Sequence, residues 1–197
     1  MKHTLTTREF NKLSRPKRAV LVAKDVISQI KSGILKVKHI YCAVKISKNT
    51  SPEADAATIF RQKKASCQAC ARGALFLSAV KFKNVLQICD ISNQNFSYRD
   101  NNDTYNTNNH TVYLSEEFDR KQQALIETAY EGRVYGRLDD FKSVDEYDAQ
   151  IDRSLKFNEV VLSKYKKLPK PRTYKKDAYL LITICKNIIK NNGTFKP

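Results

Sequence analysis

Cys67-Gln-Ala-Cys70-Ala-Arg-Gly73-Ala-Leu-Phe76 is the stretch that decides the fold, because two cysteines at CxxC spacing lead directly into an apolar run. At helical pitch both cysteines and the small residues after them fall on one face. The pattern therefore predicts one helix over residues 61–81, with both sulfurs on its packed face. Gly73 costs this helix about 1 kcal/mol relative to alanine, so we expect another segment to pack closely over it.

Two helices are predicted before the cysteine stretch. Thr6 and Glu9 have the spacing of a capping box, which predicts a short helix. Ser14, with Pro16 in the first turn, begins a longer helix that ends at Gly33.

Three helices are predicted after it, over residues 115–132, 143–168 and 177–190. The last is apolar nearly all round, so it should be buried. β-branched residues near residues 40–46 are compatible with one short extended segment there. We therefore predict a single domain over residues 1–197, mainly α, built as a bundle of five or six helices.

Charge is the strongest global signal, at a formal net +16. Residues 1–48 hold 12 Lys/Arg against 2 Asp/Glu, and residues 164–197 hold 10 against 1, whereas residues 101–163 hold 7 against 13. Basic ends predict a polyanionic partner, which would be RNA, DNA or a nucleoprotein. The alternative is that lysine is the default surface residue in the proteome of an AT-rich genome.

The sequence also indicates a compartment. No apolar run approaches the roughly 20 residues that cross a bilayer, and the amino terminus lacks the apolar core of a signal peptide. Five cysteines, an odd number, favour reduced thiols or metal ligands over a disulfide framework. We expect a cytoplasmic protein without membrane contact.

Three cysteines and one histidine form a candidate structural zinc site. The CxxC pair lets two thiolates reach one tetrahedral metal, and two residues upstream would complete the set. The alternative is that the thiols pack as small hydrophobes in the core, as we expect for Cys89 and Cys185. The candidate zinc ligands are His39, Cys42, Cys67 and Cys70.

A cysteine-based enzyme or small-ligand (nucleotide) binder is the alternative function. Cys67 or Cys70 near a helix start would have its thiolate stabilised by the helix dipole. His110 would act as base, oriented by Asp90 or Asn109. The sequence contains no GxxxxGK[ST] or GxGxxG phosphate loop, and the enzymatic interpretation is the less favoured one.

A basic strip over residues 164–176 interleaves lysines and one arginine with Tyr165 and Tyr174 around two prolines. An exposed strip of this kind contacts phosphates and offers rings for base stacking. The alternative is a solvated loop whose tyrosines pack inward. Basic residues at the start of the first long helix would extend the same surface. The candidate nucleic-acid-binding residues are Arg15, Lys17, Arg18, Lys164, Lys166, Lys167, Lys170, Arg172, Tyr174, Lys175 and Lys176.

Three motifs together resemble a group of small uncharacterised proteins from bacteriophages and bacteria. They are Tyr41-Cys42, Cys67-x-x-Cys70-Ala-x-Gly-Ala-Leu-Phe76 and Asn187-Ile-Ile-x-Asn-x-Gly-Thr-Phe195. The group offers no activity that could be carried over to this chain, so the resemblance implies context more than function. A phage origin would favour accessory roles in a host cytoplasm, such as binding a host nucleoprotein or blocking a defence system. We therefore expect a non-enzymatic basic binding protein of phage origin that contacts nucleic acid or a host nucleoprotein.

Overall fold

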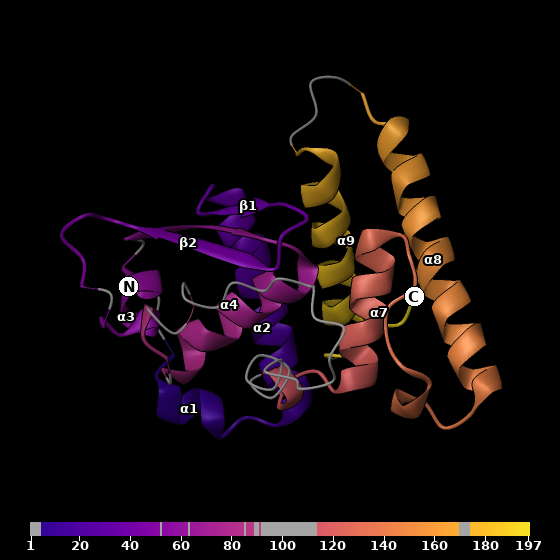
Figure 1. The fold of residues 1–197 in the computed structure, drawn as a ribbon, viewed down its shortest axis with the longest axis horizontal. Helices are drawn as coiled ribbons and strands as arrows, with labels where there is room; N and C mark the ends of the chain where they lie inside the picture. Colours follow the sequence, from indigo (N-terminus) through magenta and orange to yellow (C-terminus); the bar gives the residue numbers. More distant parts are fainter. Residues whose placement is uncertain are drawn as a thin grey trace, which may run out of the picture.

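The computed structural model describes residues 5–51, 53–62, 64–84, 86–88, 91, 114–169 and 174–197. Within this part it contains seven α-helices, one short 3-10 helix and three strands (Figure 1). The elements are α1 (Thr7–Asn11), α2 (Arg15–Lys31), β1 (Leu35–Val37), β2 (Cys42–Ile46), α3 (Ala56–Arg61), β3 (Ala65–Ala69), α4 (Ala71–Lys83), α7 (Arg120–Glu131), η1 (Leu138–Asp140), α8 (Val144–Lys166) and α9 (Lys176–Lys190). None of these helices combines the length and the apolar character that crossing a bilayer requires.

The strands form one mixed sheet in the order β1-β3-β2. The central strand β3 runs parallel to β1 and antiparallel to β2, so that Leu35 and Val44 both pair with Cys67. The prediction of a helical bundle is therefore wrong, because the fold includes this sheet. The extended segment expected near residues 40–46 is its edge strand β2.

The helix prediction fails at the cysteine stretch itself. Residues 65–69 form β3, and α4 begins only at Ala71, with Cys70 as its N-cap. The sequence Ala-Ser-Cys-Gln-Ala alternates small apolar and polar residues, and its first, third and fifth residues are buried. That period of two is typical of a half-buried strand. Cys67 fits an apolar helix face equally well, so its two strand partners decide the outcome.

Helix α4 is the centre of the core. It is buried nearly all round and packs against α1, α2, α3, α7 and the sheet. Helices α7, α8 and α9 lie together on the other side of the molecule (Figure 1). Helix α9 joins the two sides by packing against α2, and it buries Leu181, Ile184 and Ile188. The expectation that the last helix is buried is confirmed along this side.

The close packing expected at Gly73 is confirmed. A β-carbon at Gly73 would lie 1.5 Å from the carbonyl oxygen of Tyr41, in the loop between β1 and β2. The same loop receives a hydrogen bond from the Cys70 backbone N–H to the Ile40 carbonyl at 2.5 Å. Any side chain at position 73 would therefore force the loop away from the start of α4.

The residues after α9 are held against both α2 and α7. Gly193, with φ of 91°, lies so close to Pro16 that a β-carbon would be 2.4 Å from the Pro16 carbonyl oxygen. Phe195 is buried, and its N–H donates to Oε1 of Gln122 at 2.6 Å. These contacts fix the beginning of α2 relative to the helices at the end of the chain.

Candidate functional site

The three cysteines of the predicted zinc site lie at one corner of the sheet. Cys42 on β2 pairs with Ala69 and Cys67 on β3 pairs with Val44, so both sulfurs lie on the packed face of the sheet. Cys70 follows at the start of α4, and its Sγ donates a weak hydrogen bond to the Tyr41 carbonyl at 3.8 Å. The structure thus brings the three thiols together in a largely buried place.

Burial makes these thiols weak acids. Together with the neighbouring sulfurs of Cys70 and Cys67, it raises the pKa of Cys42 to about 12. Burial also raises the pKa of Cys67 to about 12, and burial with the nearby Glu127 carboxylate raises that of Cys70 to about 12. Only about one thiol in 10⁵ is then ionised at pH 7. Nucleophilic attack needs the thiolate, so these surroundings do not activate the cysteines as nucleophiles.

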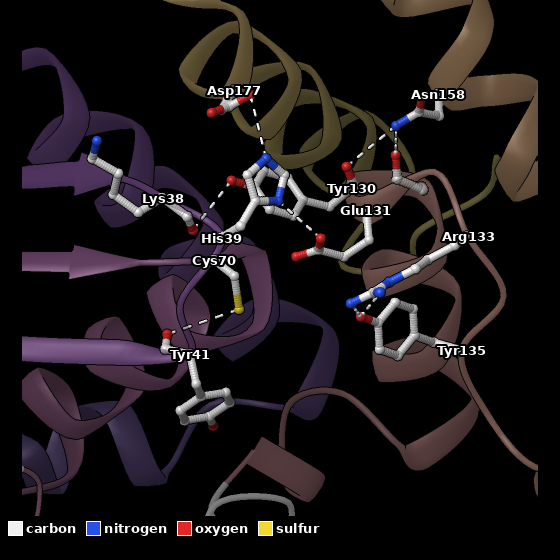
Figure 2. Close-up of polar contacts among 11 residues, drawn as sticks. Lys38, His39, Tyr41, Cys70, Tyr130, Glu131, Arg133, Tyr135, Asn158 and Asp177 are labelled. Atoms are coloured by element: carbon white, nitrogen blue, oxygen red, sulfur yellow. Dashed lines mark hydrogen bonds and ion pairs between the residues drawn. The ribbon is translucent and has the colours of Figure 1, made fainter. Parts of the chain in front are cut away.

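His39 faces carboxylates, as Figure 2 shows. Its Nδ1 lies 2.8 Å from Oε2 of Glu131, and its Nε2 lies 3.7 Å from Oδ1 of Asp177. The ring also packs at 5.3 Å from that of Tyr130, whose hydroxyl donates to the Lys38 carbonyl at 3.4 Å. His39 therefore connects the loop between β1 and β2 to the end of α7 and the start of α9.

The described residues contain no group of three or more His, Cys, Asp or Glu side chains that could hold a metal ion. The imidazole of His39 is directed to Glu131 and Asp177, and the thiol of Cys70 to a backbone carbonyl. Zinc bound by His39, Cys42, Cys67 and Cys70 stays a prediction. His110, Asp90 and Asn109, which the enzymatic alternative requires, lie outside the described residues.

Two of the three basic residues at the start of α2 form hydrogen bonds with other parts of the chain. Arg15 donates to the Ser115 carbonyl at 2.7 Å. Arg18 donates to the Glu116 carbonyl at 3.1 Å, and its Nε lies 3.3 Å from the buried carboxylate of Glu117. Of the three residues predicted to extend the basic strip, Arg15 and Arg18 therefore have partners within the chain, and Lys17 is exposed.

A buried ion pair lies beside these arginines. Nζ of Lys83 is 2.8 Å from Glu117 and 3.1 Å from Glu116. Burial raises the pKa of Glu117, against the opposing effects of Lys83 and Arg18. An open cavity of about 490 Å³ adjoins the pair and is lined by Asn11, Arg18, Lys83 and Glu116. The charges here neutralise one another and tie α2 and α4 to the segment before α7.

The lysines of the predicted strip lie at the end of α8 and the start of α9. Their side chains are exposed, and no salt bridge to Lys164, Lys167, Lys175 or Lys176 occurs within the described ranges. Lys170 and Arg172 lie outside the described residues. We call the exposed set the hairpin lysines, which are Lys164, Lys166, Lys167, Lys175 and Lys176.

The tyrosines of the strip pack inward. The Tyr165 hydroxyl donates to the Tyr174 carbonyl at 3.1 Å, and the Tyr165 ring lies 5.3 Å from that of Tyr179. Both Tyr165 and Tyr174 are half-buried. The structure therefore presents lysines at this end, while the rings join the two helices.

Sequence reasoning missed the partners that hold His39 and Lys83. Glu131 is 92 residues from His39 along the chain, and no local spacing signals the contact. Glu117 lies in an acidic pair at the start of a predicted helix, which looks like a solvated first turn until the buried Lys83 is placed beside it. Only the fold brings these charges together.

No protein-family model, curated protein or solved structure matches this chain. Cys67, Cys70, Lys83 and Glu117 are buried, whereas the hairpin lysines are exposed at the surface, where a partner can reach them.

Proposed function

We propose that this protein is a non-enzymatic binding protein that contacts RNA or DNA, free or within a nucleoprotein, through the hairpin lysines. Five lysines lie within 13 residues of sequence, on the ends of two packed helices. Clustered lysines attract phosphates and release counterions from a nucleic acid when they bind it. The phage origin and the counter-defence role stay predictions from the motifs.

The observation that carries the proposal is the position of Lys175 and Lys176. They are the N-cap and the first residue of α9, and no side chain caps this helix end. A helix N-terminus bears roughly half a positive charge, so cations there are unfavourable by about 0.3–1 kcal/mol. The one acidic residue of the first turn, Asp177, is directed toward His39. Positive charge is thus gathered where folding disfavours it and where a polyanion would stabilise it.

The lysines on α8 differ in this respect. Lys164 and Lys166 lie in the last turn of that helix, where the dipole favours cations. Folding stability alone accounts for them, whereas it does not account for Lys175 and Lys176. Substituting Lys175 and Lys176 is therefore the more decisive test of phosphate binding.

The test is a binding titration by fluorescence anisotropy, with labelled RNA and DNA strands and duplexes of about 24 nucleotides, at roughly 50 and 200 mM salt. The variant K175Q/K176Q should bind about five- to tenfold more weakly for each phosphate that it no longer neutralises. The slope of log K against log salt should become shallower by about 0.9 for each such phosphate.

The matched control is K186Q/K190Q, which removes the same charge from exposed positions at the other end of α9. This control should change the affinity by less than about twofold. If it weakens binding as much as K175Q/K176Q does, then the affinity depends on the net charge of the protein and not on the position of the hairpin lysines. Wild-type protein that binds no nucleic acid at low salt would show the proposal to be wrong. Circular dichroism of each variant confirms that it folds.

The cysteine-based alternative gains nothing from the geometry. The pKa values of Cys67 and Cys70 are raised to about 12, whereas a catalytic thiol needs a lowered one.

A further inference from the structure

The two faces of the sheet differ sharply in character. Leu35, Cys67 and Ala69 point into the core toward α2 and α4. The alternate residues form the opposite face in two cross-strand rows, of which one joins Lys36, Gln68 and Ala43 and the other joins Ser66 and Lys45. Except for Gln68, which is half-buried, these five residues are exposed. We call this set the outer face.

The outer face is positively charged and rich in hydrogen-bond donors. It presents two lysines, one hydroxyl and one amide, and Lys38 follows β1 directly with an exposed side chain. Phosphate oxygens accept hydrogen bonds from these side-chain types, and such contacts position a nucleic acid without reading its sequence. The chemistry therefore suits a phosphate backbone.

The outer face lies close to the hairpin lysines. Strand β1 packs beside α9 (Figure 1), and the loop after β1 touches the first turn of α9 through His39 and Asp177 at 3.7 Å. Lys38 comes directly before His39, and Lys176 directly before Asp177. Lys38 and Lys176 therefore each lie next in sequence to one of the two residues that form this contact.

We propose that the outer face is a second phosphate-binding surface, and that one nucleic acid bound at the hairpin lysines extends across it. The inference rests on the proposed function and adds where the bound strand runs. The recognised chemistry is the phosphodiester backbone. Affinity should therefore depend on salt and on the length of the nucleic acid more than on base sequence.

A role in folding competes with this inference. Lys36 and Lys45 lie on the two edge strands, and charged side chains on edges prevent sheets of different molecules from pairing. Such protection needs a charge of either sign, whereas phosphate binding needs a positive one. Charge reversal therefore separates the two roles.

The experiment compares the variants K36Q/K45Q, K36E/K45E and K175Q/K176Q with the control K186Q/K190Q, by anisotropy on the nucleic acid of about 24 nucleotides that binds the wild type most tightly. We expect K36Q/K45Q to make the salt slope shallower by about 1.8 and to weaken binding by about 25-fold or more, because two phosphates are no longer neutralised. K36E/K45E should remain folded and monomeric by light scattering and should bind still more weakly. Titration at concentrations above Kd should show one nucleic acid for each protein chain.

Each outcome decides a separate claim. If K175Q/K176Q weakens binding and K36E/K45E does not, the outer face is no phosphate surface, although the proposed function stands. If only the sheet variants weaken binding, the hairpin assignment is wrong and the outer face stands. Two nucleic acids bound to each chain would overturn the single extended path. If neither pair of substitutions changes binding, both proposals are wrong.

Discussion

The carbonyl oxygen of Tyr41 occupies the space that a side chain on residue 73 would need, so Gly73 and Tyr41 join the loop after β1 to the start of α4. The contact places the sheet edge on the central helix. It also explains why a glycine lies within the first turn of an otherwise apolar helix.

Substituting Gly73→Ala should lower the free energy of unfolding by about 3 kcal/mol or more, because the methyl group would overlap the Tyr41 backbone. Urea unfolding monitored by circular dichroism measures the change. The matched control is Gly33→Ala, which has a φ of 75° but no atom within 4 Å of the added carbon. This control should cost only about 1 kcal/mol. Equal losses in the two variants would contradict the close approach.

The buried cysteines should be unreactive in the folded protein. With the pKa of Cys42, Cys67 and Cys70 raised to about 12, alkylation by iodoacetamide should stay slow up to about pH 10 and become fast in urea. Mass spectrometry of the alkylated peptides reports each thiol. Rapid labelling of Cys67 or Cys70 at pH 7 would instead support the alternative in which one of these cysteines is a catalytic nucleophile.

The zinc prediction is tested separately by elemental analysis of protein purified without chelator. Packed thiols predict substoichiometric zinc and an unfolding midpoint that EDTA leaves unchanged. About one zinc per chain, absent from a C42S/C70S variant, would establish the site predicted from the sequence.

Glu117 should make stability depend on pH in a defined direction. Burial raises its pKa in the folded state, so the folded protein binds this proton more tightly than the unfolded chain does. The stabilisation that comes from the protonated carboxyl is therefore complete at low pH and is lost as pH rises through the folded pKa. Relative to E117Q, the wild type should lose stability over the pH range that begins at the ordinary carboxyl pKa of 4.5 and runs upward through the raised pKa of Glu117. Urea unfolding of both proteins across this range measures it, and a constant difference would contradict the raised pKa.

His39 and Glu131 should be energetically coupled. A double-mutant cycle with His39→Ala and Glu131→Ala should give a coupling energy of about 0.5–1 kcal/mol, since the His39 side chain is half-exposed. Amide hydrogen exchange in the loop between β1 and β2 should be faster in H39A, because the loop loses the contacts of His39 with Glu131 on α7 and Asp177 on α9. Additive effects of the two substitutions would show that the 2.8 Å contact contributes nothing to stability.

The sequence predicted most features that local chemistry controls. Ser14 and Pro16 begin α2, Ser143 caps α8 through the Glu146 N–H, and Gly132 ends α7 with a φ of 68°. The close packing over Gly73 was also predictable, because a glycine inside an apolar helix is unfavourable without such a reason.

Features set by distant partners were not predictable. Cys67 belongs to a strand because β1 and β2 pair with it from more than 20 residues earlier in the chain. Arg15 and Arg18 look like free phosphate contacts in the sequence, but each donates to a backbone carbonyl about 100 residues away. The partners of His39 are equally remote.

The packing of α2 against α9 has a consequence for synthesis in the cell. Helix α2 leaves the ribosome about 150 residues before the helix that covers it is made. Until α9 is made, the side of α2 that packs against it has no native neighbour. Strand β1 likewise has no pairing partner until β3 is made. Contacts so distant in sequence form slowly. The unfinished chain is therefore a target for chaperones and proteases until α9 has emerged.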